Sequence, residues 1–387
     1  MSFSRRILSV QPSPTLALNT KAVQLAKQGH KVLNFAVGEP DYPTPKVVVD
    51  RAIESLKAGR TKYTPAGGSL ELRQAIVDKL QRDNGLSFDT SQIVVGTGAK
   101  EILFHTFLSL LNDGDEVILT TPCWVSYADQ IRAAGGIPVM IPVTSHGRIP
   151  STEEIAKYSS PKTKAFVFNS PNNPAGYILT ESEMKELGGF LAKQGWWVIS
   201  DEIYEYMSFD HPHQSLLKVC PELKSKFILV NGLSKAFAMT GWRVGYCAAP
   251  QDVANMVKSL QSHSSTCIPG FIEDAAVVAL KHGKPLMAED VARLRQRRDM
   301  ATKLLDSLGG IKYFFPQGAY YIFVDIRDNL RGGDTSLNFS ERLLQEHHLA
   351  LAPGEAFGAP GFLRLSYATD EETITEGIKR LHKALVG

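Results

Sequence analysis

The residues best suited to chemistry lie in one short segment, SKAFAMTGWR, which spans 234–243. It places Lys235 beside Ser234 and Arg243 eight residues further on, directly after the apolar run 227–230, a predicted buried strand. A lysine at the exit of a buried strand can be partly desolvated, and a desolvated lysine loses its proton more easily and becomes a nucleophile. The neighbouring serine and arginine can hold a phosphate. Taken alone, however, the segment is more typical of a loop with a solvated lysine.

A carboxylate at the end of another predicted strand supports a chemical interpretation. Asp201 follows the apolar run 198–200, and in parallel α/β sheets ligands bind beyond the carboxyl ends of the strands. Pyridoxal 5'-phosphate (PLP) serves as an electron sink only while its pyridine nitrogen is protonated, and a buried carboxylate enforces that state. A nucleophilic lysine, a phosphate-binding arginine and this carboxylate together favour a PLP site. The ordinary alternative for Asp201 is a helix N-cap.

Two turns add candidate polar contacts. The turn SPNNPAG follows the predicted strand 165–168, so the Asn173 amide can reach the cofactor's ring oxygen, as can Tyr204. The segment 94–103 predicts a strand, a glycine turn and a helix, and free N–H groups at a helix start attract phosphate. Both features are also typical of turns with no ligand.

Alternating strand-like and helix-like segments through the middle of the chain predict the scaffold that positions these residues. This alternation is typical of a mainly parallel sheet covered by helices on both faces. One predicted helix spans 181–193. Short apolar runs predict the strands, at 117–120, 139–143, 165–168, 197–200, 227–230 and 244–249.

The pattern changes after residue 273. Amphipathic helices are predicted at 293–308 and 371–386, and strands at 318–324 and 363–367. We interpret this part as a second, smaller α+β domain. A chain of 387 residues also exceeds one typical core, so two domains are expected.

Four motifs, in this order, resemble the PLP-dependent class I aminotransferases of fold type I, in the branch of bacterial-type aspartate aminotransferases. They are SPNNPAG at 170–176, SDEIYE at 200–205, SKAFAMTGWRVGY at 234–246 and FLRLSYA at 362–368. The resemblance implies an α/β fold, with a large PLP-binding domain at 46–284 built on a mainly parallel seven-stranded sheet. It also implies a small domain formed by 1–45 together with 285–387.

The same resemblance implies a role for each candidate cofactor residue. Lys235 would be the covalent anchor and base, and Asp201 and Tyr204 the other catalytic residues. Trp124 would stack on the pyridine ring, and Asn173 and Tyr204 would contact its ring oxygen. The phosphate would be held by five residues of this chain and by Tyr63 of a neighbouring subunit: Gly98, Ala99, Lys100, Ser234 and Arg243. Gly232 stands where the family often has a second serine, so one hydroxyl contact is expected to be missing.

Substrate contacts are implied for Arg364, Gly38, Trp124 and Asn173. Arg364 would bind the α-carboxylate as a fork, and the backbone of Gly38 would lie beside the substrate. Without the resemblance, Trp124 would be a core residue, Tyr63 an ordinary loop residue and Arg364 a partner in a surface salt bridge.

The expected activity is that of an aspartate transaminase in amino acid metabolism and biosynthesis. The amino group of an L-amino acid, aspartate, would pass to 2-oxoglutarate by a ping-pong mechanism through a Lys235 Schiff base. Gln11 stands before Pro12 where related enzymes that accept dicarboxylic substrates, some of them prephenate, often carry a lysine. This departure argues against a strong preference for aspartate or prephenate and leaves room for alanine and aromatic amino acids. Prephenate stays among the alternative substrates. A C–S lyase on the same scaffold also stays open, whereas a non-catalytic binding module is disfavoured by the intact lysine.

Composition, the N-terminal sequence and the cysteine spacing indicate which partners and which cellular compartment to expect. The formal net charge of +2 and the lack of a dense basic run argue against nucleic acid, and no apolar stretch reaches the roughly 18–20 residues of a membrane helix. The N-terminus has no apolar stretch typical of a secretory signal. The four cysteines have no paired spacing, which favours reduced thiols in a cytoplasm and no bound metal. We therefore expect a cytoplasmic homodimer with shared active sites.

Overall fold

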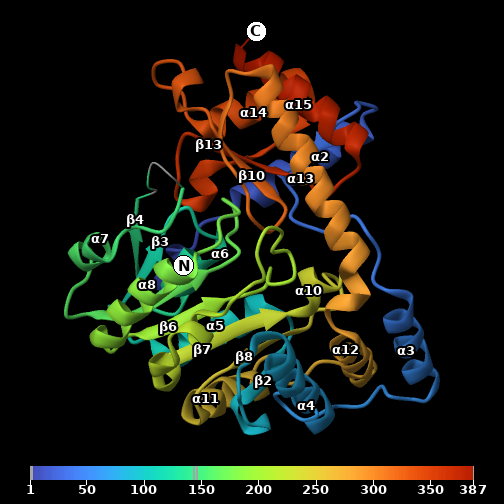
Figure 1. Ribbon diagram of the computed structural model, residues 1–387, viewed down its shortest axis with the longest axis vertical. Helices are drawn as coiled ribbons and strands as arrows, with labels where there is room; N and C mark the ends of the chain where they lie inside the picture. Colours follow the sequence, from blue (N-terminus) through green and yellow to red (C-terminus); the bar gives the residue numbers. More distant parts are fainter. Residues whose placement is uncertain (1–2, 143, 145–146, 387) are drawn as a thin grey trace.

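A seven-stranded sheet forms the centre of the computed structural model, which describes residues 3–142, 144 and 147–386. The strand order is β2-β8-β7-β6-β5-β3-β4 (Figure 1). Only β8 runs antiparallel to its neighbours, so the sheet is mainly parallel as expected. The strands are β2 (Ile93–Gly96), β3 (Glu116–Thr120), β4 (Ile137–Ile141), β5 (Thr163–Asn169), β6 (Trp197–Asp201), β7 (Phe227–Gly232) and β8 (Gly245–Ala248).

Helices cover both faces of this sheet, because alternate strand residues face two separate apolar cores. One face packs against α5 and α11 through Ile102, Leu103 and Val253, and the other packs against α4 and α12 through Ile76 and Ala276. The helices of this region are α3 (Lys46–Lys57), α4 (Leu70–Lys79), α5 (Ala99–Leu110), α6 (Ser126–Ala133), α7 (Thr152–Lys157), α8 (Glu181–Gln194), α9 (Leu216–Val219), α10 (Leu233–Ala236), α11 (Gln251–Ser262) and α12 (Gly270–His282).

Strand register brings three chain segments to the same edge of the sheet. Asn169 of β5 lies opposite Asp201 of β6, and Asp201 lies opposite Val230 of β7. The turn that carries Asn173 and the helix that carries Lys235 follow directly from these strand ends. The local order strand–turn–helix thus gathers residues that are far apart in the sequence.

A second region stands above the large sheet in Figure 1, joined to it by the long helix α13 (Ala288–Leu308). Its antiparallel sheet has the order β12-β13-β10-β9, and a parallel pair, β1 with β11, ties the N-terminal segment to it. The strands are β1 (Leu33–Asn34), β9 (Lys312–Phe314), β10 (Tyr321–Asp325), β11 (Leu349–Ala350), β12 (Ala352–Pro353) and β13 (Phe362–Ser366). The other helices are α1 (Arg5–Leu8), α2 (Pro14–Lys27), α14 (Ser336–His347) and α15 (Glu371–Val386).

The expected strand at 318–324 begins later than predicted. Gly318 forms only an isolated antiparallel bridge with Ser208, Ala319 and Tyr320 belong to a turn in which Ala319 has a positive φ of 57°, and β10 starts only at Tyr321. An apolar run does not reveal such a turn, because the turn residues are themselves small or aromatic. The strand expected at 139–143 is β4, which ends at Ile141; residue 143 lies outside the described residues.

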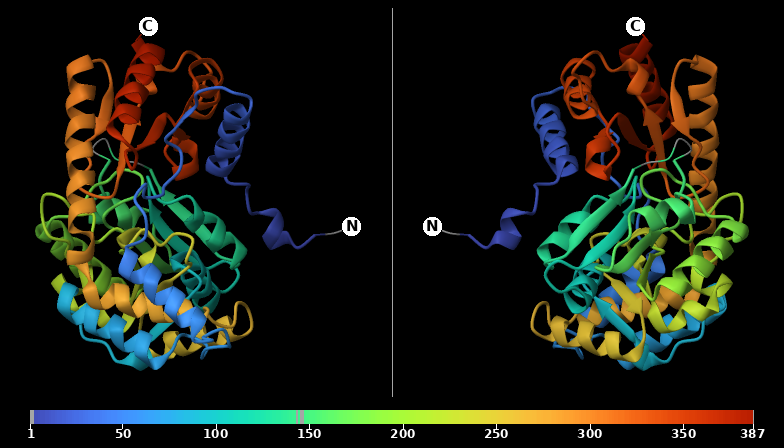
Figure 2. Two further views of the ribbon diagram at one scale, coloured as in Figure 1. Left: turned by 90° about the vertical axis from the view of Figure 1, so that its right-hand side faces the viewer. Right: turned by 90° about the vertical axis from the view of Figure 1, so that its left-hand side faces the viewer.

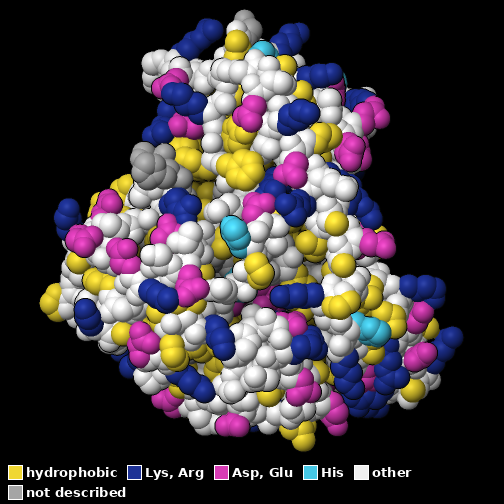
Figure 3. Space-filling model, viewed as in Figure 1, with side chains coloured by type: hydrophobic (Ala, Val, Ile, Leu, Met, Phe, Trp, Pro, Cys, Tyr) yellow, Lys and Arg dark blue, Asp and Glu magenta, His cyan; other side chains and the backbone are white. Residues whose placement is uncertain are grey.

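The surface agrees with the near-neutral composition. Basic and acidic side chains are interspersed over most of the face shown in Figure 3. Figure 2 shows the N-terminal segment, with α1, reaching out from the body of the molecule. Among the described helices, none is both long and apolar enough to cross a membrane.

Candidate active site

A cavity of about 390 Å³ opens at the carboxyl ends of β5, β6 and β7, between the large sheet and the second region. Its wall contains all of the predicted site residues except Gly98 and Tyr63. Those in the wall are Gly38, Ala99, Lys100, Trp124, Asn173, Asp201, Tyr204, Ser234, Lys235, Arg243 and Arg364.

Lys235 lies on α10, one short turn after β7 ends. Its amine donates a hydrogen bond of 2.5 Å to the carbonyl oxygen of Gly38, which also accepts one of 3.0 Å from the Tyr320 hydroxyl. Burial, and then the nearby Arg364 guanidinium, lower the pKa of Lys235 to about 8. A useful fraction of this amine is therefore unprotonated near neutral pH and able to act as a nucleophile.

Asp201 is buried at the end of β6 and is held by two donors. The Tyr127 hydroxyl donates to Oδ2 at 2.6 Å, and the backbone N–H of Ile203 donates to Oδ1 at 3.2 Å. Burial raises the pKa of Asp201 to about 6, against the opposing effect of the Tyr127 hydrogen bond. The carboxylate is ionised at neutral pH and available to a cationic ring nitrogen.

A chain of polar contacts joins the two regions across the cavity. Arg364 of β13 donates to Asn173 Oδ1 at 3.0 Å and to the carbonyl oxygen of Ala36 at 2.7 Å. The Asn173 amide in turn lies 3.4 Å from the Tyr204 hydroxyl, which is 2.9 Å from the hydroxyl of Tyr321. Among the described residues no carboxylate pairs with Arg364, and its Nε has no hydrogen-bond partner. This buried cation can therefore accept an incoming carboxylate.

The start of α5 forms the other end of the cavity. Gly98 caps this helix with a φ of 92°, and the first N–H groups of an α-helix have no partner inside it. A Cβ at Gly98 would lie 2.6 Å from Nη2 of Arg243, so glycine is needed for the guanidinium to approach the helix start. Arg243 itself has a positive φ of 57° and donates to the carbonyl oxygens of Thr240 and Thr97. This donor set, with Ser234, fits a phosphate group.

Trp124 and Lys100 form a further part of the wall. The Lys100 ammonium lies 5.0 Å from the centre of the Trp124 ring, and the centroids of the Trp124 and Tyr127 rings lie 5.3 Å apart in a T-shaped arrangement. Burial, together with the charge of Arg243, lowers the pKa of Lys100. Lys100 has no acidic partner among the ion pairs of the described residues.

Tyr63 does not line this cavity. It belongs to the loop between α3 and α4, and its side chain is 89% exposed. Gly98 does not line the cavity either, although its neighbours Ala99 and Arg243 do.

Several wall residues were not predicted from the sequence. Tyr127 and Tyr321 contact predicted residues, and Ser13, Thr15 and Asn19 reach the cavity from α2 and its start. The only sequence signal for Tyr127 is its place three residues after Trp124 at a helix start. The backbone N–H of Gln11 binds Asp129 Oδ1 at 3.3 Å, and Gln11 is not part of the wall.

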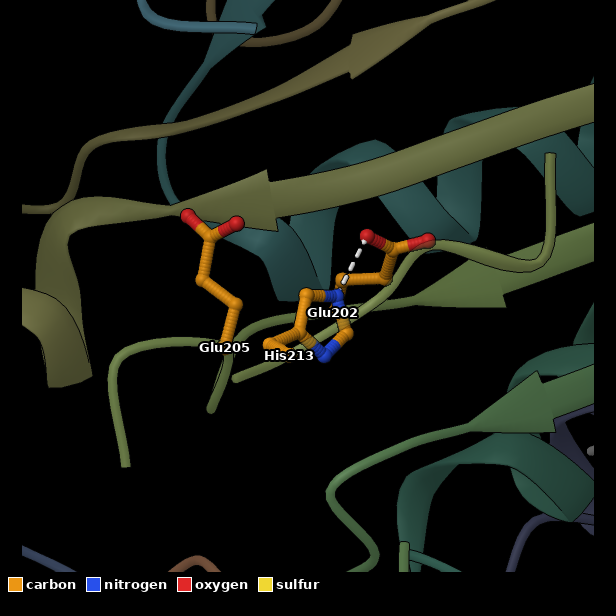
Figure 4. Close-up of side chains that lie close together, drawn as sticks. All are labelled: Glu202, Glu205 and His213. Atoms are coloured by element: carbon orange, nitrogen blue, oxygen red, sulfur yellow. Dashed lines mark hydrogen bonds and ion pairs between the residues drawn. The ribbon is translucent and has the colours of Figure 1, made fainter. Parts of the chain in front are cut away.

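The other two carboxylates of the SDEIYE segment, those of Glu202 and Glu205, belong to a buried polar cluster with His213 (Figure 4). Glu202 accepts hydrogen bonds from Ser200, Ser215 and His213, the last at 2.9 Å. Glu205 lies within reach of the same histidine and forms an ion pair with Lys79, which is only 2% exposed. Lys79 thus offsets the charge of Glu205, and Glu202 is held by its three hydrogen bonds, so both carboxylates are satisfied by the protein's own groups.

Comparison with known proteins agrees with this geometry. The family model for aminotransferase class I and II matches residues 30–381, and the chain belongs to this family. A probable aspartate/prephenate aminotransferase of Aquifex aeolicus is 42% identical, over 98% of both chains. An aspartate aminotransferase of Geobacillus stearothermophilus is 38% identical, over 99% of this chain and 98% of that protein. The structure of a Thermus thermophilus aspartate aminotransferase with maleate superimposes with a TM-score of 0.93, at 36% identity and full coverage of both chains. Family membership implies PLP as the cofactor.

Proposed function

We propose that this protein is a PLP-dependent aminotransferase that moves the amino group of L-aspartate to 2-oxoglutarate. The observation that carries the proposal is the cavity that gathers Lys235, Asp201, Arg243 and Arg364. It holds a nucleophilic amine, a buried carboxylate, a phosphate-binding cation and a second cation for the substrate. Bound PLP supplies an electron sink for the carbanion formed at the substrate's α-carbon.

Each residue then has a distinct task. Lys235 would hold PLP covalently and would serve as the base that accepts the substrate's α-proton. Asp201 would keep the ring nitrogen protonated, and Tyr204 and Asn173 would contact the ring oxygen. Trp124 would stack on the ring. The phosphate would be held by the backbone N–H groups of Gly98, Ala99 and Lys100 and by the side chains of Ser234 and Arg243, which leaves the Lys100 ammonium free for another task.

Two groups orient the substrate. Arg364 binds its α-carboxylate, and the backbone of Gly38 lies beside it, where Lys235 and Tyr320 already converge on the Gly38 carbonyl. A Cβ at Gly38 would lie 2.3 Å from the Tyr321 hydroxyl, so a larger residue would disturb this wall.

The choice of aspartate is supported by the cations of the cavity. Lys235, Arg243 and Arg364 have the tasks given above, which leaves Lys100 for a side-chain carboxylate. Two relatives of the chain also support aspartate: one is named an aspartate aminotransferase, and the other a probable aspartate/prephenate aminotransferase. Gln11, which stands where related enzymes often have a lysine, does not line the cavity. Its identity therefore does not change the assignment of Lys100 to the side-chain carboxylate.

Replacing Lys100 with glutamine should lower kcat/KM for aspartate by roughly 10-fold, the loss of one charge-assisted contact. Alanine, which has no second carboxylate, should be affected far less. A panel of amino donors at fixed 2-oxoglutarate measures both, with the exposed Lys185→Gln as control. Equal losses for aspartate and alanine would show that Lys100 does not select the substrate.

The reaction class is tested by its products. With aspartate and 2-oxoglutarate the protein should form glutamate, in amounts that match the aspartate consumed. In a parallel assay with a cysteine S-conjugate, formation of pyruvate, ammonia and a free thiol in equal amounts would instead support elimination, the reaction of a C–S lyase on the same fold.

We also propose that the chain divides into a large domain at 46–284 and a small domain formed by 1–45 and 285–387. Arg364 belongs to the second and reaches Asn173 of the first. A carboxylate bound by Arg364 would therefore pull the domains together and exclude water from the cavity.

Arg364→Lys is expected to lower kcat/KM for every amino donor by roughly 10-fold or more, because lysine cannot form a two-pronged contact. PLP content should be unchanged, which absorbance of the purified protein measures. A variant that lost PLP, or lost activity with only one class of side chain, would contradict this role.

A homodimer with shared active sites is proposed from Tyr63 and its surroundings. Tyr63 is exposed, and the helices on either side of its loop, α3 and α4, also expose apolar side chains, among them Ile53, Leu56 and Leu70. Exposed apolar side chains of this kind support a surface that is covered by another chain. The four cysteines are unpaired in the structure, which supports the proposal of a reducing, cytoplasmic compartment.

Tyr63→Phe should weaken PLP binding several-fold, since a hydrogen bond to an ionised phosphate is lost. Titration of the cofactor-free protein with PLP measures this, and sedimentation measures the assembly. An active monomer at assay concentration, or unchanged PLP affinity in the variant, would contradict the shared site.

A further inference from the structure

Tyr127 is the closest side-chain neighbour of the Asp201 carboxylate. Its hydroxyl donates to Oδ2 at 2.6 Å, and both side chains are buried. The ring is fixed in two ways: Tyr127 lies in the first turn of α6, and it packs against the Trp124 ring in a T-shaped arrangement. The residue therefore couples the position of the carboxylate to that of the aromatic wall beside it.

The direction of this hydrogen bond is settled by the environment. Burial and the neighbouring carboxylate raise the pKa of Tyr127 well above its usual value, so the phenol keeps its proton and must be the donor. Donation to a carboxylate favours its ionised form, and it opposes the effect of burial on Asp201. The Ile203 N–H occupies the other oxygen at 3.2 Å and is the weaker of the two contacts by distance.

We propose that Tyr127 is a positioning residue that orients Asp201 and keeps it ionised, so that the ring nitrogen of bound PLP stays protonated. This inference rests on the function proposed above and adds a residue to it. The proton between a ring nitrogen and a buried carboxyl group has two positions. On nitrogen, it leaves an anionic carboxylate that the Tyr127 hydroxyl stabilises; on oxygen, it leaves a neutral ring, which is a poor electron sink.

The Tyr127→Phe variant tests whether the Tyr127 hydroxyl decides between these two positions of the proton. Phenylalanine fills nearly the same volume and keeps the contact with Trp124, so the fold should be retained, which thermal unfolding checks. Without the hydroxyl, Asp201 loses a charge-assisted hydrogen bond in a buried site, and the proton should shift toward the carboxyl oxygen.

The test uses the full-length protein loaded with PLP that carries ¹⁵N in its ring. The nitrogen resonance should report a protonated ring in the unchanged protein and a shift toward the unprotonated position in Tyr127→Phe. The dissociation constant of PLP should rise roughly 10-fold, and kcat should fall more than KM changes.

Tyr206→Phe is the matched control. Tyr206 is buried and donates to Asp83 Oδ2 at 2.8 Å, but it is not part of the cavity wall. It should leave the nitrogen resonance and PLP affinity unchanged.

A Tyr127→Phe protein with the unchanged nitrogen resonance and PLP affinity would overturn the inference and leave the proposed function standing. Equal shifts in both variants would also overturn it, because they would reflect a general loss of packing. If the unchanged protein bound no PLP, the proposed function itself would fail, and the inference with it.

Discussion

Lys235→Ala is expected to lower transamination by more than about 1,000-fold, since one side chain serves as both covalent anchor and general base. The pKa of about 8 means that this amine is readily deprotonated in its cavity. The visible absorbance of lysine-bound PLP should be lost while the fold is retained. Activity and absorbance of the purified variant measure both effects.

Chemical rescue provides the control for this prediction. A small primary amine added to Lys235→Ala can enter the vacated space and accept the α-proton, so it should restore part of the rate. The same amine should not raise the rate of the Arg364→Lys variant, which keeps Lys235. Near-normal turnover of Lys235→Ala without added amine would exclude Lys235 as the base.

Asp201→Asn is expected to lower kcat by roughly 100-fold or more, as loss of a charge aimed at the reacting group typically does. Asparagine has nearly the same shape but carries no negative charge, so it cannot hold a proton on the ring nitrogen. PLP should also bind more weakly. Steady-state kinetics at saturating PLP separates the loss of rate from the loss of cofactor.

Glu202→Gln is the matched control for Asp201→Asn. Glu202 is the next residue, equally buried, but its side chain faces the cluster of Figure 4 rather than the cavity. Its replacement should affect stability, through the lost contact with His213, far more than kcat. A similar fall in kcat for both variants would mean that general disruption of β6, and not the charge of Asp201, sets the rate.

The main features of the fold followed from the sequence because they depend on local patterns. Apolar runs identified the strands that end at Asp201 and lead to Lys235, and parallel strands necessarily bring their carboxyl ends to one edge. The antiparallel direction of β8 was not evident, because an apolar run has the same pattern in either direction.

Contacts between distant segments could not be predicted in the same way. The hydrogen bond from Tyr127 to Asp201 and that between Tyr204 and Tyr321 join residues 74 and 117 positions apart. They depend on how helices and the second sheet pack against the first, which no local pattern encodes. The N-terminal segment is a second example: Ser13 and Asn19, at the start of α2 and within it, reach the cavity, and no motif in this segment indicates that they do.

Identification of the lysine that carries PLP tests the central claim most directly. The protein is incubated with PLP, treated with borohydride to reduce any Schiff base to a stable bond, and digested for mass spectrometry. The account predicts one modified peptide, with PLP on Lys235. Modification of Lys100 or of surface lysines, with Lys235 left free, would contradict it.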